Sequence, residues 1–236
     1  MARRLIAEGL GTALLLAAVV GSGIMGERLA GGNIAIALLA NAIATGAALV
    51  ALISTFASIS GAHFNPVVTL IEAVRARLVW REAAGYIAAQ VAGAFVGVAA
   101  AHVMFSEALF SVSLHARSGG AQLFSEFVAT FGLIGVILGC SRTRAVAVPF
   151  AVGAYITAAY WFTASTSFAN PAVTLARAAT NTFAGIRPAD VPGFVVAQLL
   201  GGAAAAAVFT WLLPNSRAMA DVVDMEALRR ERKAVR

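Results

Sequence analysis

The sequence predicts an all-α membrane protein, with six transmembrane helices and two re-entrant half-helices arranged as an inverted repeat. Three observations predict this fold. Six apolar stretches are long enough to cross about 30 Å of hydrocarbon. An Asn-Pro pair opens a shorter apolar stretch in each half of the chain. The two halves also share three sequence markers in the same order, which indicates an internal repeat.

Composition supports the six spans. The chain has 236 residues, of which 60% are hydrophobic and 12% are charged, too little polar material to cover a soluble surface of that size. The spans are continuously apolar, so they favour helices over the alternating strands of an outer-membrane barrel. They run approximately over Leu5–Met25, Ile34–Phe56, Ala83–Met104, Leu123–Gly139, Ala145–Thr163 and Val191–Leu213.

The net charge of +6 follows membrane topology and does not point to a nucleic-acid partner. If the N-terminus is cytoplasmic, thirteen of the 17 basic residues fall inside, as the positive-inside rule expects. We therefore predict a multi-pass protein of the inner (plasma) membrane, in contact with lipid, with both termini cytoplasmic. The four basic residues placed outside are Arg28, Arg117, Arg177 and Arg187.

The repeat predicts one domain over residues 1–214, with copies at about 1–112 and 118–214, and a charged cytoplasmic tail over 215–236. Each copy contains three spans, an odd number, so the second copy enters the membrane from the opposite side. The paired markers are Glu8 in AEGLGT with Glu126 in SEFVAT, Asn65 in HFNPVVTL with Asn170 in FANPAVTL, and Gln90 in AAQVAGA with Gln198 in VAQLLGG.

The two Asn-Pro stretches are too short to span a bilayer. They run from Asn65 to about Val74 and from Asn170 to about Ala178. About ten helical residues cover roughly 15 Å, half of the hydrocarbon. Asparagine at the cap and proline at the first helical position give a strong start signal. We expect two half-helices that enter from opposite faces and meet at the midplane; two surface helices with the same caps are the simpler alternative.

These motifs resemble those of the aquaporin and aquaglyceroporin family of major intrinsic proteins, and the chain is similar to the bacterial arsenic-resistance-associated subgroup. The first triplet is Asn65, Pro66 and Val67, with valine where the family usually has alanine, and the second is Asn170, Pro171 and Ala172. The resemblance implies a homotetramer in which each subunit has its own pore, with both asparagines at the pore centre. It implies no cofactor and no metal.

The resemblance also places a filter at four positions counted from the two asparagines: Thr45, Ala158, Ser167 and Val173. All four side chains are small, and the aromatic residues and arginine of typical members are missing there. Arg177 lies one helical turn, about 6 Å, beyond Val173, so we do not expect it to reach the pore. A wide filter predicts a channel for small neutral solutes: metalloid hydroxides such as arsenite, with glycerol, urea, ammonia or water also possible.

Two roles remain open for the paired glutamates. Glu8 and Glu126 could carry protons in a proton-coupled secondary transporter, because membrane carboxylates are costly and usually functional. In the family that the chain resembles, the matching glutamates instead hold the half-helix loops through backbone hydrogen bonds, which would make them structural.

Histidine and cysteine do not indicate an enzyme. His63, His102 and His115 are scattered without a metal-binding spacing, and Cys140 has no evident activating base. His63 stands two residues before Asn65, where it could line the cytoplasmic vestibule and act as a pH gate. The alternative is a packing and hydrogen-bonding imidazole.

Overall fold

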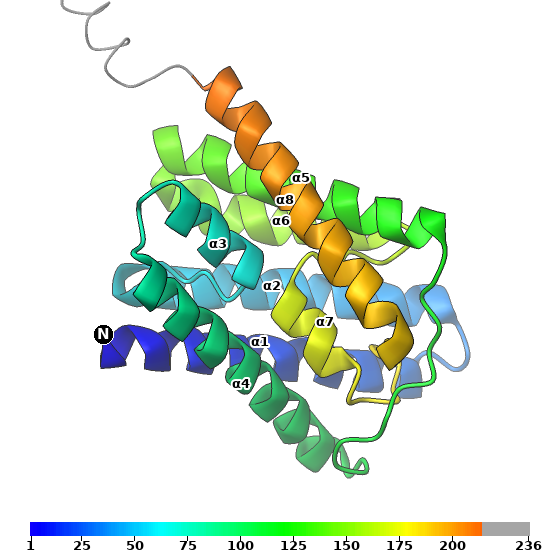
Figure 1. The fold of residues 1–236 in the computed structure, drawn as a ribbon. Helices are drawn as coiled ribbons and strands as arrows, with labels where there is room; N and C mark the ends of the chain where they lie inside the picture. Colours follow the sequence, from blue (N-terminus) through cyan, green and yellow to red (C-terminus); the bar gives the residue numbers. More distant parts are fainter. Residues whose placement is uncertain (214–236) are drawn as a thin grey trace, which may run out of the picture.

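The computed structural model describes residues 1–213, in which long helices surround two short ones (Figure 1). The predicted tail, 215–236, lies outside the described residues. Six helical segments have the length and hydropathy to cross a membrane. The long helices are α1 (Ala2–Leu29), α2 (Ile34–Ser60), α4 (Trp80–Phe105), α5 (Gly120–Thr143), α6 (Val148–Phe162) and α8 (Val191–Leu212). The short ones are α3 (Pro66–Val74) and α7 (Pro171–Arg177), with 3-10 turns at Ala145–Ala147 and Pro188–Asp190.

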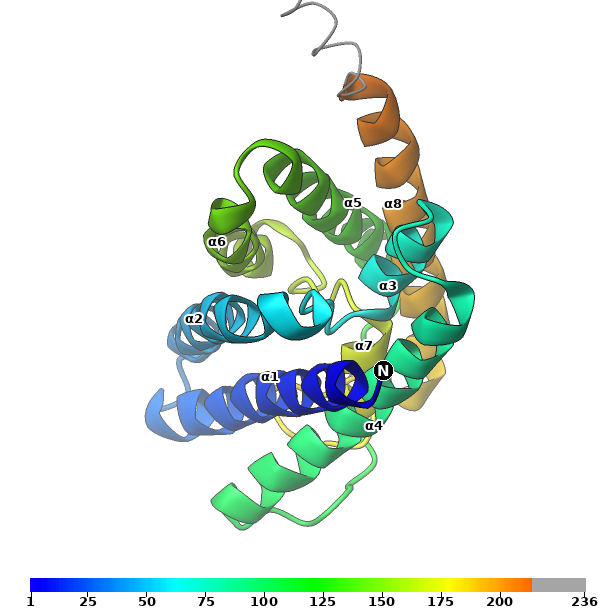
Figure 2. The same ribbon diagram turned by 90° about the vertical axis from the view of Figure 1, so that its left-hand side faces the viewer.

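Helix packing repeats between the two halves of the chain. Helix α1 packs on α2 and α4, just as α5 packs on α6 and α8. The half-helices contact the opposite half of the chain, since α3 contacts α8 and α7 contacts α4. Helix α2 packs against α6, which joins the two halves (Figure 2). Exchanging the halves leaves this pattern of contacts unchanged, which is the arrangement expected of an inverted repeat.

Most long helices extend past the predicted apolar spans. Helix α1 begins at Ala2, before the predicted start at Leu5, and α5 continues to Thr143, beyond Gly139. Hydropathy marks only the hydrocarbon core, whereas helical hydrogen bonding continues into the interface. Side chains such as Val96, 61% exposed, and Val196, 56% exposed, cover the outside of the bundle with apolar surface suited to lipid.

Glycine lets the outer helices of each half approach closely. A Cβ atom at Gly93 would collide with the backbone of Gly9, and one at Gly201 would collide with the carbonyl of Phe127. The first contact joins α4 to α1, and the second joins α8 to α5. Small residues bring membrane helices together in this way, so these crossings fix the frame that surrounds the half-helices.

Candidate functional site

Each half-helix begins at an asparagine whose side chain caps its own first turn. The Asn65 Oδ1 accepts the backbone N–H of Val67 at 2.9 Å. The Asn170 Oδ1 accepts those of Ala172 at 3.0 Å and Val173 at 3.3 Å. Proline follows both asparagines, at a position where a backbone donor would lack a helical partner. The predicted half-helices therefore form, and the cap orients each asparagine amide.

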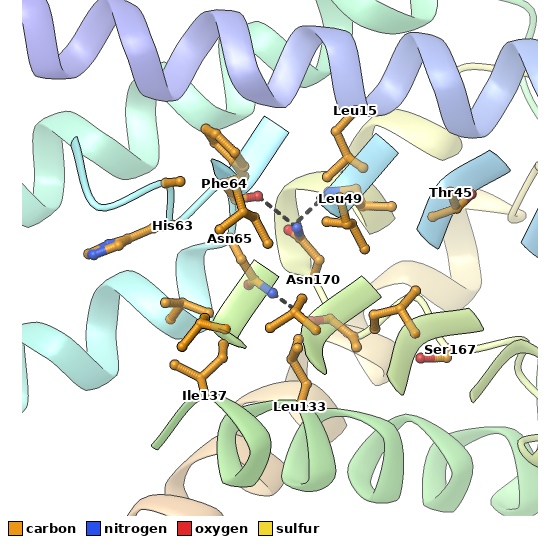
Figure 3. A pocket seen from close by; sticks show the side chains of 18 of the residues that line it. Leu15, Thr45, Leu49, His63, Phe64, Asn65, Leu133, Ile137, Ser167 and Asn170 are labelled. Carbon is orange, nitrogen blue, oxygen red and sulfur yellow. Dashed lines mark hydrogen bonds between the residues drawn. The ribbon is translucent and has the colours of Figure 1, made fainter. Parts of the chain in front are cut away.

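The two asparagines bridge the half-helices at the centre of the bundle (Figure 3). The Asn65 Nδ2 donates to the Ala169 carbonyl at 2.7 Å, and the Asn170 Nδ2 donates to the Phe64 carbonyl at 2.8 Å. An amide nitrogen carries two hydrogens, so each bridge leaves one hydrogen for another acceptor. Both asparagines line a cavity, into which those remaining hydrogens can donate.

The loops before the half-helices are strained. Ala62 and Phe64 have φ values of 51° and 49°, and Ser167 and Ala169, at the matching positions, have 53° and 49°. Left-handed backbone costs a residue with a side chain roughly 1–2 kcal/mol. Such loops need additional interactions to keep this conformation.

Glu8 supplies these interactions to the first loop. Its buried carboxylate accepts the backbone N–H groups of His63 at 3.0 Å and Phe64 at 2.8 Å. It also accepts the Ser60 hydroxyl at 2.6 Å and the Gln90 amide at 2.8 Å. All four partners are donors, an arrangement that suits an ionised carboxylate.

Glu126 makes the matching set of contacts in the second half. It accepts the N–H groups of Phe168 at 2.9 Å and Ala169 at 2.8 Å, and the amide of Gln198 at 2.6 Å. The side chain is fully buried. These contacts favour the loop-holding role over proton carriage, because a protonated carboxylic acid would lose an acceptor site that the loop uses.

One cavity of about 270 Å³ passes both asparagines. Glu72 and Arg77 line it at the end that carries the N-terminus, and Arg177 lines it at the opposite end. Its wall is mainly aliphatic between these ends. The apolar lining comes from α1, α2, α3, α5 and α6, and includes Ile53 and Val152. Figure 3 shows four more of these residues, Leu15, Leu49, Leu133 and Ile137.

Three of the four predicted filter residues lie at the cavity, towards the end lined by Arg177. These are Thr45, Ser167 and Val173, each no more than 5% exposed. Thr45 and Ser167 contribute hydroxyl groups (Figure 3). The Ser167 Oγ is buried and has no hydrogen-bond partner among the described residues, so it can bond to a molecule in the cavity.

The prediction for Ala158 is wrong. Its side chain is exposed on the outside of α6, and the cavity is lined by Ile156 and Tyr160, two residues to either side of it. Two residues correspond to about 200° of helical rotation, so these side chains and that of Ala158 point in opposite directions. Tyr160 is ten residues before Asn170, not twelve, and its hydroxyl lies 3.2 Å from that of Thr45. Sequence spacing therefore missed an aromatic residue.

The expectation for Arg177 is also wrong, because its side chain lines the cavity. Its guanidinium carbon lies 3.4 Å from the centroid of the Phe168 ring, and its Nε donates to the Ala184 carbonyl. Helical side chains point back towards the helix N-terminus and cover the preceding turn. That direction offsets the extra turn that separates Arg177 from Val173.

The remaining motif residues lie behind the cavity wall. Pro66, Val67, Pro171 and Ala172 are buried, but they do not line the cavity. Val67 packs in the cluster formed with α5 and α8, against Gly202. Glycine at 202 leaves the room that the larger side chain at this triplet position requires.

His63 lines the cavity at the end that carries the N-terminus. Its Nδ1 lies 3.0 Å from the Thr69 hydroxyl, and its ring packs edge-on against Tyr86 at 5.3 Å between centroids. The imidazole therefore packs and hydrogen-bonds while it lines the cavity, and its role as a pH gate is a separate question that these contacts do not test.

Comparison with known proteins identifies the family. The sequence profile of the family described as Major intrinsic protein matches residues 1–145 and 139–233, nearly the entire chain. The chain belongs to the major intrinsic protein family.

Individual relatives and a solved structure extend the comparison. The chain is 57% identical over 217 residues to the aquaglyceroporin AqpS of Rhizobium meliloti, covering 92% of this chain and 93% of that one. It is 35% identical over 181 residues to the rice aquaporin NIP1-3, covering 74% of this chain and 62% of that one. The aquaglyceroporin structure from Plasmodium falciparum matches with a TM-score of 0.69 at 20% identity, over 88% of this chain and 95% of that one, which supports the fold.

Proposed function

We propose that the chain is a passive membrane channel for small neutral solutes. The observation that carries this proposal is the single cavity that passes Asn65 and Asn170, where the N-termini of two half-helices meet. Each helix N-terminus presents about half a positive charge. Two such ends at the middle of the cavity disfavour cations, and the amide hydrogens can donate to the oxygen of an uncharged solute.

The proposed solutes are metalloid hydroxides such as arsenite, with glycerol, urea and water also passing. The cavity places the hydroxyls of Thr45, Tyr160 and Ser167 at one end of a mainly aliphatic wall. Hydroxyls both donate and accept, which suits a solute that carries several hydroxyl groups. The 57% identical relative is named an aquaglyceroporin, which agrees with this solute class.

The passive mechanism is preferred to proton-coupled transport. Both candidate proton carriers, Glu8 and Glu126, already accept hydrogen bonds from the loops that position the asparagines. A cycle of protonation would release those loops from their strained conformation. Solute flux should therefore follow the solute gradient alone, and acceleration by an imposed proton gradient would favour the transporter instead.

Purified protein in liposomes tests the proposal, with uptake of arsenite, glycerol and water measured side by side. Replacing the cavity-lining Leu133 by tryptophan should block all three fluxes, because the larger ring fills the cavity. Val196→Trp, on the exposed surface of α8, is the matched control and should conduct normally. Strict water selectivity would overturn the solute assignment, and normal flux through Leu133→Trp would overturn the assignment of this cavity as the pathway.

We further propose a homotetramer in the inner membrane with cytoplasmic termini. The cavity is lined by one chain, so each subunit would conduct independently. Native mass spectrometry from lipid nanodiscs measures the subunit number, and a monomer there would refute the tetramer.

Thiol labelling tests the topology. In a Cys140→Ala background, the cysteine of Arg3→Cys should resist an impermeant thiol reagent applied to intact cells. Labelling of that cysteine would show that the N-terminus lies outside the cell.

A further inference from the structure

A buried guanidinium lies at the end of the cavity where the sequence predicts no arginine. Val173 occupies the usual arginine position, but Arg177 lines the same end of the cavity and is only 2% exposed. Its Nε is bound to the Ala184 carbonyl, and the guanidinium stacks on Phe168. Within residues 1–213 the terminal amino groups of Arg177 make no hydrogen bond that meets normal geometry, so they remain available to a molecule in the cavity.

A second arginine strengthens the positive potential at this end. The Arg117 guanidinium lies 4.9 Å from the centroid of the same Phe168 ring. Its Nε donates to the Gly185 carbonyl at 2.8 Å, and one terminal nitrogen donates to the Ser165 carbonyl at 3.1 Å. Loop carbonyls therefore hold Arg117, and no carboxylate pairs with its guanidinium among the described residues.

The nearby carboxylates are already bonded elsewhere. Glu126 accepts from the loop backbone at Phe168 and Ala169. Asp190 accepts the backbone N–H of Arg117 and pairs with the Arg187 side chain at 2.9 Å. Neither carboxylate pairs with the Arg177 guanidinium, so within the described part of the chain its positive charge acts on the cavity without a counter-charge in direct contact.

We infer that Arg177 is the cation-excluding and solute-orienting residue of this channel, acting from one turn beyond the expected position. The inference rests on the proposed passive-channel function and specifies how its outer selectivity arises. A unit positive charge roughly 6 to 12 Å from a passing cation, at an effective dielectric near 20, lowers cation entry by about a hundredfold to tenfold. Thr45 and Tyr160 line the same cavity with their hydroxyls 3.2 Å apart, and the amino groups of Arg177 would also donate to a solute oxygen there.

A pair of charge-removing variants tests the inference in liposomes. Arg177→Gln should raise sodium leak at least about tenfold over wild type, while glycerol uptake persists. Arg28→Gln is the matched control, since Arg28 lies on the exposed end of α1 with 50% of its side chain accessible, and its leak should equal that of wild type. Unchanged leak in a glycerol-conducting Arg177→Gln protein would overturn the role of Arg177. Absence of glycerol uptake by wild type would instead overturn the proposed function.

Chemical restoration of the charge tests the same role in a second variant. An Arg177→Cys protein, in a Cys140→Ala background, should leak sodium. Reaction with a cationic methanethiosulfonate should return its sodium leak to the wild-type level. An uncharged methanethiosulfonate of similar size should leave the leak high. Equal sealing by both reagents would show that bulk and not charge excludes the ion, and this outcome would overturn the inference.

Discussion

Asn65 and Asn170 each donate to the loop that precedes the other, at 2.7 Å and 2.8 Å, so each half-helix fixes the end of its counterpart. The caps of the two helices and the bridge between them use the same two side chains. Oδ1 of each residue closes its own helix, and Nδ2 crosses to the other half. A substitution that affects only the nitrogen would separate these roles.

We predict that Asn170→Asp keeps the cap but loses cation exclusion. A carboxylate still accepts from Ala172 and Val173, whereas it cannot donate to the Phe64 carbonyl, and it adds a negative charge beside the cavity. Sodium leak in liposomes should rise about tenfold or more, with glycerol uptake within about threefold of wild type. Asn33→Asp, at the exposed cap of α2, should leave the leak unchanged. An Asn170→Asp channel whose sodium leak equals that of wild type would contradict the electrostatic role of the cavity centre.

The loop contacts of Glu126 predict a large loss of stability in Glu126→Gln. An amide can accept through only one of its two polar atoms, so Phe168, Ala169 and Gln198 cannot all keep their bonds. The free energy of unfolding should fall by about 2–4 kcal/mol, measured by thermal denaturation in detergent. Glu107→Gln removes an exposed ion pair with Arg28 and should cost at most about 1 kcal/mol. A stable Glu126→Gln protein that lost only a proton-driven flux would instead support the transporter.

Much of the site follows from helical phase. Cavity-lining residues recur every fourth position: Thr45, Leu49 and Ile53 on α2, and Val152, Ile156 and Tyr160 on α6. Apolar length likewise predicted the six spans, and the Asn-Pro motifs predicted both half-helices. Continuing the four-residue pattern along α6 reaches Tyr160 and passes over Ala158, so this signal was available in the sequence.

Other features could not be read from the sequence. Which face of α6 points towards Asn170 depends on the path of the loop at 163–169. Residues with left-handed backbone set that path. Counting residues across such a loop therefore placed Ala158 in the filter. The positions of Arg117 and Arg177 on Phe168 depend on long side chains and on a loop without regular structure, which have no local pattern.

Extending the side chain at Val173 should narrow the solute range. Val173 lines the cavity at the end that Arg177 also lines, so Val173→Arg adds both bulk and a further positive charge there. Arsenite and glycerol uptake should fall by about tenfold or more, with water permeability reduced less. Val173→Met adds length without charge and separates the two effects. Unchanged arsenite and glycerol uptake in Val173→Arg would refute the assignment of this position to the filter.

The pH response of the channel follows from the environment of His63, which lies outside the spanning helices. Burial lowers the pKa of the His63 imidazole from its ordinary 6.5, although Glu8 and Glu72 act in the opposite direction and Arg4 adds to the lowering. The ring is therefore neutral above pH 6.5 and takes up a proton only in more acidic solution. Glycerol permeability should stay constant from pH 6.5 to about pH 8, in wild type and in His63→Gln alike. A step in permeability within this interval that His63→Gln abolishes would show that the imidazole titrates there, against the direction that its burial imposes.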